Sequence, residues 1–241
     1  MWPRRVPLHG PAADEPRGDA VSTEGKAVIL CLADVKSKPV RWLDPRRIPL
    51  GKHTSLIGDP GVGKSGIALD YAARVSTGRE MPDGSHGDLY EEPAGVVILS
   101  AEDDPADTIK PRLEAMGADL DRIVMLAGVV TKDGERMPNL HDLPAIKQAV
   151  LRVKAKLVIV DPVMAYLPGG TDSYKDQHVR QALAPLCKLA RERGFALLVV
   201  AHLNKSVEQV KAIYRAGGSI GIAGNARSLL LAAPAKTARR T

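Results

Sequence analysis

Aromatic residues are scarce in this chain. They make up 3% of its 241 residues, although hydrophobic residues make up 44%. A core built from this composition has to be aliphatic, which is what a parallel sheet covered by helices on both faces requires. A chain of this length forms one α/β domain with a sizeable core, and it is too short for two such domains and a linker.

Cysteine is also rare, and long apolar runs are missing. Cys31 and Cys187 have neither metal-binding nor redox-motif spacing, so we expect two reduced, buried core thiols in a cytosolic protein. No apolar run reaches the length of a membrane span, so no membrane partner is expected. Residues 1–5 carry charge but no apolar stretch follows them, so we expect no signal peptide and a cytoplasmic location.

Acidic residues are nearly absent from the last part of the chain. The net charge is +6, and residues 205–241 contain seven Lys or Arg and one acid, Glu208. A basic segment attracts a polyanion, but a solvated tail has the same composition, and charge alone leaves both interpretations open. Residues 1–24, rich in Pro, Gly and Ala without periodicity, are expected to be a disordered leader before a domain over 25–241.

The most informative feature that is present is a glycine-rich loop fitting G-x-x-x-x-G-K-[ST]. Such a loop directs backbone N–H groups at nucleotide phosphates, with the lysine at the β- and γ-phosphates and the hydroxyl on Mg²⁺. A strand expected at 53–57 enters the loop, and a helix expected at 64–75 leaves it, with Gly78 as its C-cap. The loop residues are Gly58, Asp59, Pro60, Gly61, Val62, Gly63, Lys64 and Ser65. We predict ATP or GTP binding, with an ordinary glycine-rich turn as the alternative.

Strands and helices are expected to alternate along the rest of the chain. This alternation, with continuous aliphatic strands, predicts an α/β fold with a doubly wound, mostly parallel sheet. Ligands of such sheets lie outside the carboxyl ends of the strands. The expected strands are 95–100, 122–126, 156–161 and 196–202, the expected helices are 105–116, 143–153 and 176–193, and 27–32 is a candidate outlying strand.

Acidic side chains follow two of these strands. Asp161 closes a buried run and is suited to the Mg²⁺ shell beside Ser65, with a turn-starting aspartate as the alternative. Glu102 is suited to orienting an attacking water. Capping of the next helix is the competing role for this acidic cluster, and Asp103 or Asp104 can fill it while Glu102 keeps the first role.

Two further candidates come later in the chain. His202 ends a strand and is suited to contacting a γ-phosphate, while a structural histidine is equally open. Arg227 is a candidate arginine finger for a neighbouring subunit, with a surface charge as the alternative. Two nucleotide-using classes are disfavoured, because residues 204–207 (NKSV) lack the acid of the N-K-x-D guanine motif and no L-S-G-G-Q-like signature is present.

In this combination the chain resembles a RecA-like ATPase. More narrowly, it resembles the plasmid replicative helicase RepA family and its phage and plasmid relatives. The stretches that carry the resemblance run from about residue 40 to 230 and include the loop, LSAED (99–103), VIVDP (158–162), VVAHLNK (199–205) and GNARS (224–228).

The resemblance implies roles for individual residues. Lys64 and Ser65 would bind phosphate and Mg²⁺, Glu102 would activate water, and Asp161 would support the metal. His202 would sense the γ-phosphate of ATP, and Arg227 would reach a neighbour's site in a homo-oligomeric ring or filament.

The resemblance also implies two nucleic-acid loops. One covers residues 163–175, from Val163 to Lys175, and the other covers 205–218, from Lys205 to Gly218. The second contains Lys205, Lys211 and Arg215, which suit phosphates, and Tyr214, which suits stacking on a base.

One departure from the family concerns the end of the chain. Further strands usually follow the Arg227 region, but this chain stops soon after Leu231, so it is either truncated or a variant lacking the last hairpins. Ring assembly is therefore left open. We favour a helicase-type motor in plasmid- or phage-like replication. The alternatives are an ATP-dependent assembly or regulatory module, and a recombinase-type filament on single-stranded DNA.

Overall fold

The computed structural model describes residues 29–171, 175–202 and 220–234. The chain divides into two units, Met1–Lys38 and Pro39–Thr241. The leader predicted at 1–24 lies outside the described residues.

The described part of the first unit is an extended segment with one short 3-10 turn, η1 (Leu32–Asp34). The outlying strand expected at 27–32 is wrong over its described residues, where Ile29, Leu30 and Leu32 remain between 76 and 87% exposed. A strand needs a ladder partner, and none is found among the described residues of this unit.

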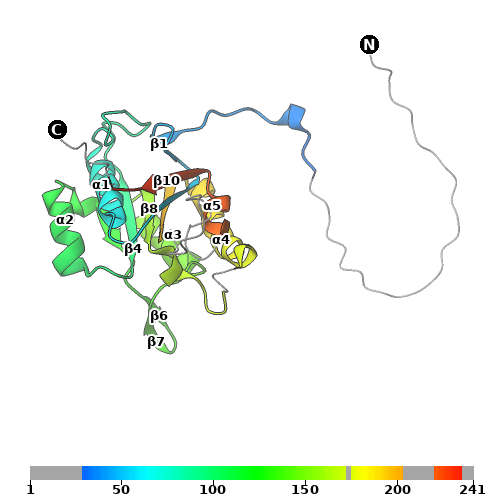
Figure 1. Ribbon diagram of the computed structural model, residues 1–241. Helices are drawn as coiled ribbons and strands as arrows, with labels where there is room; N and C mark the ends of the chain where they lie inside the picture. The colour runs from blue at the N-terminus through cyan, green and yellow to red at the C-terminus, as the bar shows by residue number, and fades with distance from the viewer. Residues whose placement is uncertain (1–28, 172–174, 203–219, 235–241) are drawn as a thin grey trace, which may run out of the picture. The chain divides into compact units, whose positions relative to one another are not determined.

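The second unit is built around a six-stranded sheet in which every neighbouring pair is parallel (Figure 1). The strand order is β10-β3-β9-β8-β4-β5, so β9 separates β3 from β8. This confirms the α/β, doubly wound parallel sheet expected from the sequence. The strands are β3 (His53–Gly58), β4 (Gly95–Ser100), β5 (Ile123–Met125), β8 (Ala155–Asp161), β9 (Ala196–His202) and β10 (Ser228–Ala232).

Helices cover both faces of this sheet. Side chains alternate along each strand, so in β4 Val97 and Leu99 pack on one face while Val96 and Ile98 pack on the other. Burial on both faces explains why the strands are continuously aliphatic. The first face carries α3 (Leu143–Arg152), α4 (Asp176–Arg193) and α5 (Ile220–Asn225), and the second carries α1 (Lys64–Thr77), α2 (Lys110–Ala115) and the π-helical turn η2 (Pro105–Ile109).

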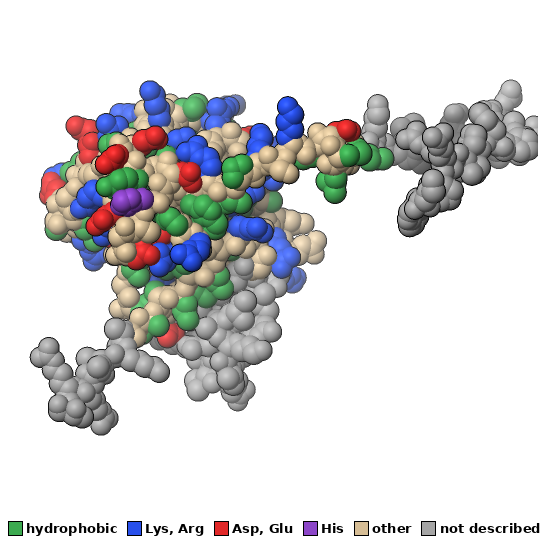
Figure 2. Space-filling model, turned by 90° about the horizontal axis from the view of Figure 1, so that it is seen from above, with side chains coloured by type: hydrophobic (Ala, Val, Ile, Leu, Met, Phe, Trp, Pro, Cys, Tyr) green, Lys and Arg blue, Asp and Glu red, His purple; other side chains and the backbone are tan. Residues whose placement is uncertain are grey.

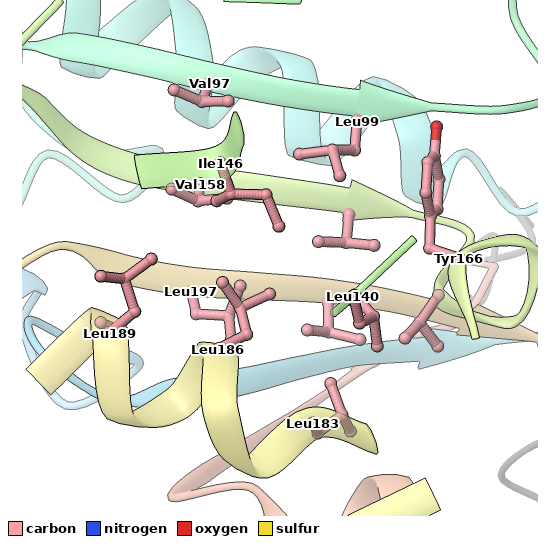
Figure 3. Close-up of a cluster of buried hydrophobic side chains, with 14 of the residues drawn as sticks. Val97, Leu99, Leu140, Ile146, Val158, Tyr166, Leu183, Leu186, Leu189 and Leu197 are labelled. Atoms are coloured by element: carbon pink, nitrogen blue, oxygen red, sulfur yellow. The ribbon is translucent and has the colours of Figure 1, made fainter. Parts of the chain in front are cut away.

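The core beneath α4 is mainly aliphatic, as the composition predicted. Figure 3 shows Leu183, Leu186 and Leu189 of α4 directed toward the sheet, where Val158 and Leu197 meet them. The aromatic members of this cluster are Tyr166 and Phe195.

Several small elements were not predicted. β1 (Trp42–Asp44) and β2 (Ile48–Pro49) form an antiparallel pair, and β6 (Val129–Thr131) and β7 (Gly134–Arg136) form a hairpin that projects from the body (Figure 1). Two 3-10 turns, η3 (Leu120–Arg122) and η4 (Val163–Tyr166), precede β5 and follow β8. These elements have two to four residues each, too few to produce a readable hydrophobic period.

Both cysteines are free, but only one is covered. Cys31 is exposed, so its expected burial is wrong, because it lies in the extended segment rather than in the core. Cys187 is partly buried, and burial raises the pKa of its thiol to about 11. Among the described helices, none is both long and apolar enough to cross a membrane.

Candidate nucleotide site

Three of the predicted site residues lie at one edge of the sheet because their strands are parallel. Gly58, the last residue of β3, is opposite His202 of β9. On the other side of β9, β8 ends at Asp161, which is opposite Ser100 at the end of β4. The polar strand ends recognised in the sequence therefore meet around the glycine-rich loop.

The loop needs glycine for two different reasons. At Gly58 the reason is space, since a Cβ would lie 2.5 Å from the carbonyl oxygen of Ala232 on β10. At Gly63 the reason is conformation, since its φ of 84° lies in the left-handed region, directly before α1 begins at Lys64. The backbone thus turns sharply into the helix N-terminus, where N–H groups are free to bind an anion.

Lys64 is held beneath the loop and is only 4% exposed. Its Nζ donates hydrogen bonds to the carbonyl oxygens of Gly58, at 3.0 Å, and Asp59, at 2.8 Å. Burial lowers the pKa of its ammonium, while the nearby carboxylates of Asp161, Asp59 and Glu102 oppose that shift. The two hydrogen bonds thus hold the ammonium group of Lys64 at the glycine-rich loop.

Asp161 is buried beside Ser65. Burial raises the pKa of its carboxyl group, and a hydrogen bond from the Ser65 side chain opposes the rise. The two side chains line a small hollow together with Ser100 and Asp103. The sequence did not single out Ser100, and it assigned Asp103 only to capping.

This donor set fits Mg²⁺ that arrives with a nucleotide. Mg²⁺ takes oxygen ligands and is commonly held by one or two protein groups plus substrate phosphates. The Ser65 hydroxyl and the Asp161 carboxylate are such groups. Within the described residues, no cluster of three or more His, Cys, Asp or Glu side chains would hold a metal ion by itself.

Glu102 and His202 face each other across the end of β8. Glu102 Oε1 lies 3.7 Å from His202 Nε2, and the side chains are 60% and 39% exposed. The other ring nitrogen of the histidine, Nδ1, is buried and has no hydrogen-bond partner among the described residues. A carboxylate two residues beyond the end of β4 and an imidazole at the end of β9 thus lie close together, although they are 100 positions apart in sequence.

The capping role in the acidic cluster belongs to Asp104. Its Oδ1 accepts hydrogen bonds from the backbone N–H groups of Ala106, at 2.7 Å, and Asp107, at 3.2 Å. Asp103 instead contacts Arg112, whose Nη1 lies 3.2 Å from Asp103 Oδ2. Glu102 makes neither of these contacts, which leaves it facing His202.

Arg227 lies away from this edge. It is exposed, and its backbone N–H donates to the carbonyl oxygen of His53 at 2.8 Å, at the amino end of β3. β3 has six residues, so its two ends are about 17 Å apart at roughly 3.3 Å per residue. The structure does not bring Arg227 to the loop of its own chain.

The two nucleic-acid loops implied by the resemblance are described only in part. The first begins with η4 and continues to Thr171, and Gly169 and Gly170 line an open hollow of about 330 Å³ with His141 and His178. Residues 172–174 and the whole second loop, 205–218, lie outside the described residues. On the face shown in Figure 2, basic and acidic side chains are interspersed.

Known proteins similar to this chain include three bacterial proteins named DNA repair protein RadA. Identity is 27% over 150 residues for the protein of Halalkalibacterium halodurans, 24% over 151 residues for that of Streptococcus pneumoniae, and 25% over 155 residues for that of Bacillus subtilis. Each alignment covers 61% of this chain but only 27 to 29% of the relative.

A broader match is to the AAA domain family, and it covers residues 26–208. These residues include the glycine-rich loop and every strand of the sheet except β10. The parallel sheet, the loop between β3 and α1, and the acids at the strand ends agree with that match. The chain therefore belongs to the AAA domain family, and its core is a RecA-like P-loop ATPase fold.

Proposed function

We propose that this chain is a Mg²⁺-dependent ATPase domain that acts on DNA. The observation that carries the proposal is the convergence of four groups at one edge of the sheet. They are the buried Lys64 ammonium, the Ser65–Asp161 pair counted as one group, the Glu102 carboxylate and the His202 imidazole that faces it.

Each group has a chemical role in this proposal. Lys64 and the first N–H groups of α1 bind the phosphates, and Ser65 and Asp161 hold Mg²⁺, which when bound neutralises phosphate charge. Glu102 accepts a hydrogen bond from the attacking water and orients it. His202 contacts the γ-phosphate, and its contact with Glu102 changes when that phosphate leaves.

DNA is the proposed partner for two reasons. The similar proteins are named for DNA repair, and the excess of positive charge lies in residues 205–241, beginning directly after the strand end that carries His202. The resemblance to RepA-type helicases supports the finer proposal of a helicase-type motor in a homo-oligomer. A filament protein of DNA repair is the second candidate, favoured by the names of the relatives.

The test is steady-state ATP hydrolysis with Mg²⁺, with and without single-stranded DNA. We expect DNA to stimulate turnover in the unmodified chain. Glu102→Gln should retain nucleotide binding and lose hydrolysis by roughly a hundredfold or more, since it removes the water-orienting base. Lys64→Ala should lose nucleotide binding. Glu114→Gln, on the exposed side of α2, removes the same charge and should leave turnover unchanged.

Two results would contradict the proposal. Wild-type turnover in Glu102→Gln would return that residue to a structural role, and unchanged nucleotide affinity in Lys64→Ala would refute the phosphate site. Nucleotide binding with negligible turnover, with and without DNA, would instead indicate an assembly or regulatory module. Closed rings or filaments in electron micrographs with ATP and DNA would separate the motor from the filament protein.

A further inference from the structure

A buried polar cluster lies at the amino end of β3, away from the nucleotide loop. His53, Thr54 and Ser55 are between 0 and 3% exposed, although this strand end is surrounded by aliphatic packing. Ser55 Oγ lies 3.0 Å from His53 Nε2 and 3.2 Å from the carbonyl oxygen of Ile222 in α5. The last contact joins residues 167 positions apart in the chain.

His53 and Ser55 both contact the carboxyl end of α5. Ser55 Oγ donates its proton to the Ile222 carbonyl. Burial lowers the pKa of His53 to about 4, so the imidazole is neutral, and a hydrogen bond with the backbone of Asn225, the last residue of α5, opposes that fall. The two side chains, 3.0 Å apart, therefore connect β3 to the end of this helix.

The end of α5 needs such a donor. The last four carbonyl groups of a helix have no partner within it, and in this six-residue helix Ile222 is one of them. Ile222 is also fully buried against the core under α4. On the α4 side, the Arg180 side chain lies close to Gly224. A Cβ on this glycine would be 2.7 Å from Arg180 Nη2. The carboxyl end of α5 is thus hydrogen-bonded to β3 and packed against α4.

Arg227 comes two residues after this fixed end. Its own backbone N–H donates to the His53 carbonyl, so His53 and Ser55 together contact the chain on both sides of the turn between α5 and β10. The guanidinium is exposed beyond this anchored backbone. Its position relative to the rest of the molecule therefore depends on the amino end of β3.

We propose that His53 and Ser55 are positioning residues that fix α5 and thereby hold Arg227 in place to act on the nucleotide of a neighbouring subunit. The inference rests on the proposed function, because Arg227 can contribute to catalysis only if the protein hydrolyses ATP. It adds a role for the strand that also carries the nucleotide loop. In this proposal the loop after the carboxyl end of β3 binds the chain's own nucleotide. The amino end of β3 fixes the position of Arg227, which acts on the nucleotide of the next subunit.

The test compares Ser55→Ala with a control on the same strand. Ser55→Ala removes the donor to Ile222. Thr54→Val removes a buried hydroxyl that has no hydrogen-bond partner among the described residues, and it keeps the side-chain shape. Hydrogen exchange is measured at the amides of residues 220–227, and kcat and KM are measured for ATP. Ser55→Thr, which keeps the hydroxyl, tests whether the donor itself matters.

We expect Ser55→Ala to speed amide exchange over residues 220–227 at least tenfold and to lower kcat at least tenfold with little change in KM. Thr54→Val and Ser55→Thr should stay within about twofold of wild type in both measurements. Adding Ser55→Ala to Arg227→Ala should lower kcat no further, because the arginine being positioned is already absent. Unchanged exchange in Ser55→Ala, or losses that multiply in the double variant, would overturn the inference.

The two proposals fail in different ways. If Glu102→Gln hydrolyses ATP normally, the proposed function is wrong whatever Ser55 does. If Glu102→Gln and Arg227→Ala both lose turnover while Ser55→Ala keeps it, the function stands and the positioning inference is overturned. If Arg227→Ala keeps wild-type turnover, the positioning inference is overturned as well.

Discussion

Lys64 and His53 are two buried basic side chains, one after the carboxyl end of β3 and one at its amino end, and burial lowers the pKa of both. Lys64 sits at the loop after β3, with two carbonyl acceptors and three carboxylates nearby that oppose the fall in its pKa. His53, at the other end, has no carboxylate among the causes of its shift, and burial lowers its pKa to about 4. The lysine thus suits an anion site, whereas the histidine is a neutral donor.

The pKa of His53 predicts a pH-dependent stability. The pKa in the unfolded chain is near 6.5, so the unfolded state binds a proton first as the pH falls. Stability from His53 is complete above about pH 6.5 and is lost as the pH falls toward about 4. The loss reaches about 3 kcal/mol, since one pKa unit corresponds to roughly 1.4 kcal/mol.

Urea unfolding from pH 7.5 to 4.5 measures this effect. His53→Gln keeps an N–H donor but cannot take up a proton, so its stability should fall less steeply than that of the wild type below pH 6.5. His86→Gln, at an exposed imidazole, should follow the wild type. Parallel curves for wild type and His53→Gln would show that the histidine is not held neutral.

At the scale of elements, the long strands and helices were predictable because they are buried in a regular pattern. The expected strands 95–100 and 196–202 and the expected helix 176–193 match β4, β9 and α4 to the residue. The helix expected at 105–116 contains the π-helical turn η2 before α2, a distinction that hydrophobic spacing does not reveal.

Other parts of the structure depend on strand order, which a single sequence does not give. The sequence does not predict β10 (SLLLA), which follows Arg227, as a strand of this sheet, because its neighbour β3 is about 170 positions earlier. For the same reason, the candidate site residues were found individually while the contact between Glu102 and His202 was not. The contacts among His53, Ser55 and Ile222 are not predictable from the sequence, because buried polar strand residues carry no motif.

In the acidic cluster after β4, substitutions can separate helix capping by Asp104 from the proposed role of Glu102 in hydrolysis. Asp104→Ala removes the acceptor for two N–H groups at the start of η2, which should cost about 1 kcal/mol of unfolding free energy. It should leave kcat for ATP near the wild-type value, in contrast to Glu102→Gln. Asp133→Ala, in the exposed turn of the β6–β7 hairpin, is the stability control. A hundredfold loss of kcat in Asp104→Ala would place the cap residue in the reaction.

At the scale of the whole molecule, the loop and Arg227 lie at opposite ends of the sheet. A single chain therefore presents the candidate nucleotide site at one end of the sheet and the backbone-anchored, exposed Arg227 at the other. If subunits associate head to tail, each site can be completed by the next subunit's Arg227. Loss of such an arginine typically lowers turnover by roughly a thousandfold or more.

Mixing two inactive variants tests this arrangement. Lys64→Ala subunits cannot bind ATP but still carry Arg227, while Arg227→Ala subunits bind ATP but lack the arginine. A mixture should hydrolyse ATP well above the mean of the two separate preparations, because some sites combine an intact loop with an intact arginine. Arg193→Ala, at the exposed end of α4, should be active alone. Turnover equal to the mean would show that the arginine does not act between subunits.

The close approach of β10 to Gly58 also has a consequence for synthesis on the ribosome. β3 is made early, but one of its two neighbours, β10, is formed by residues 228–232. Until those residues emerge, one edge of β3 has no ladder partner, and such edges invite pairing with other chains. The nascent polypeptide therefore passes through a stage in which the strand leading into the glycine-rich loop is open to aggregation, and this stage ends when β10 emerges and pairs with it.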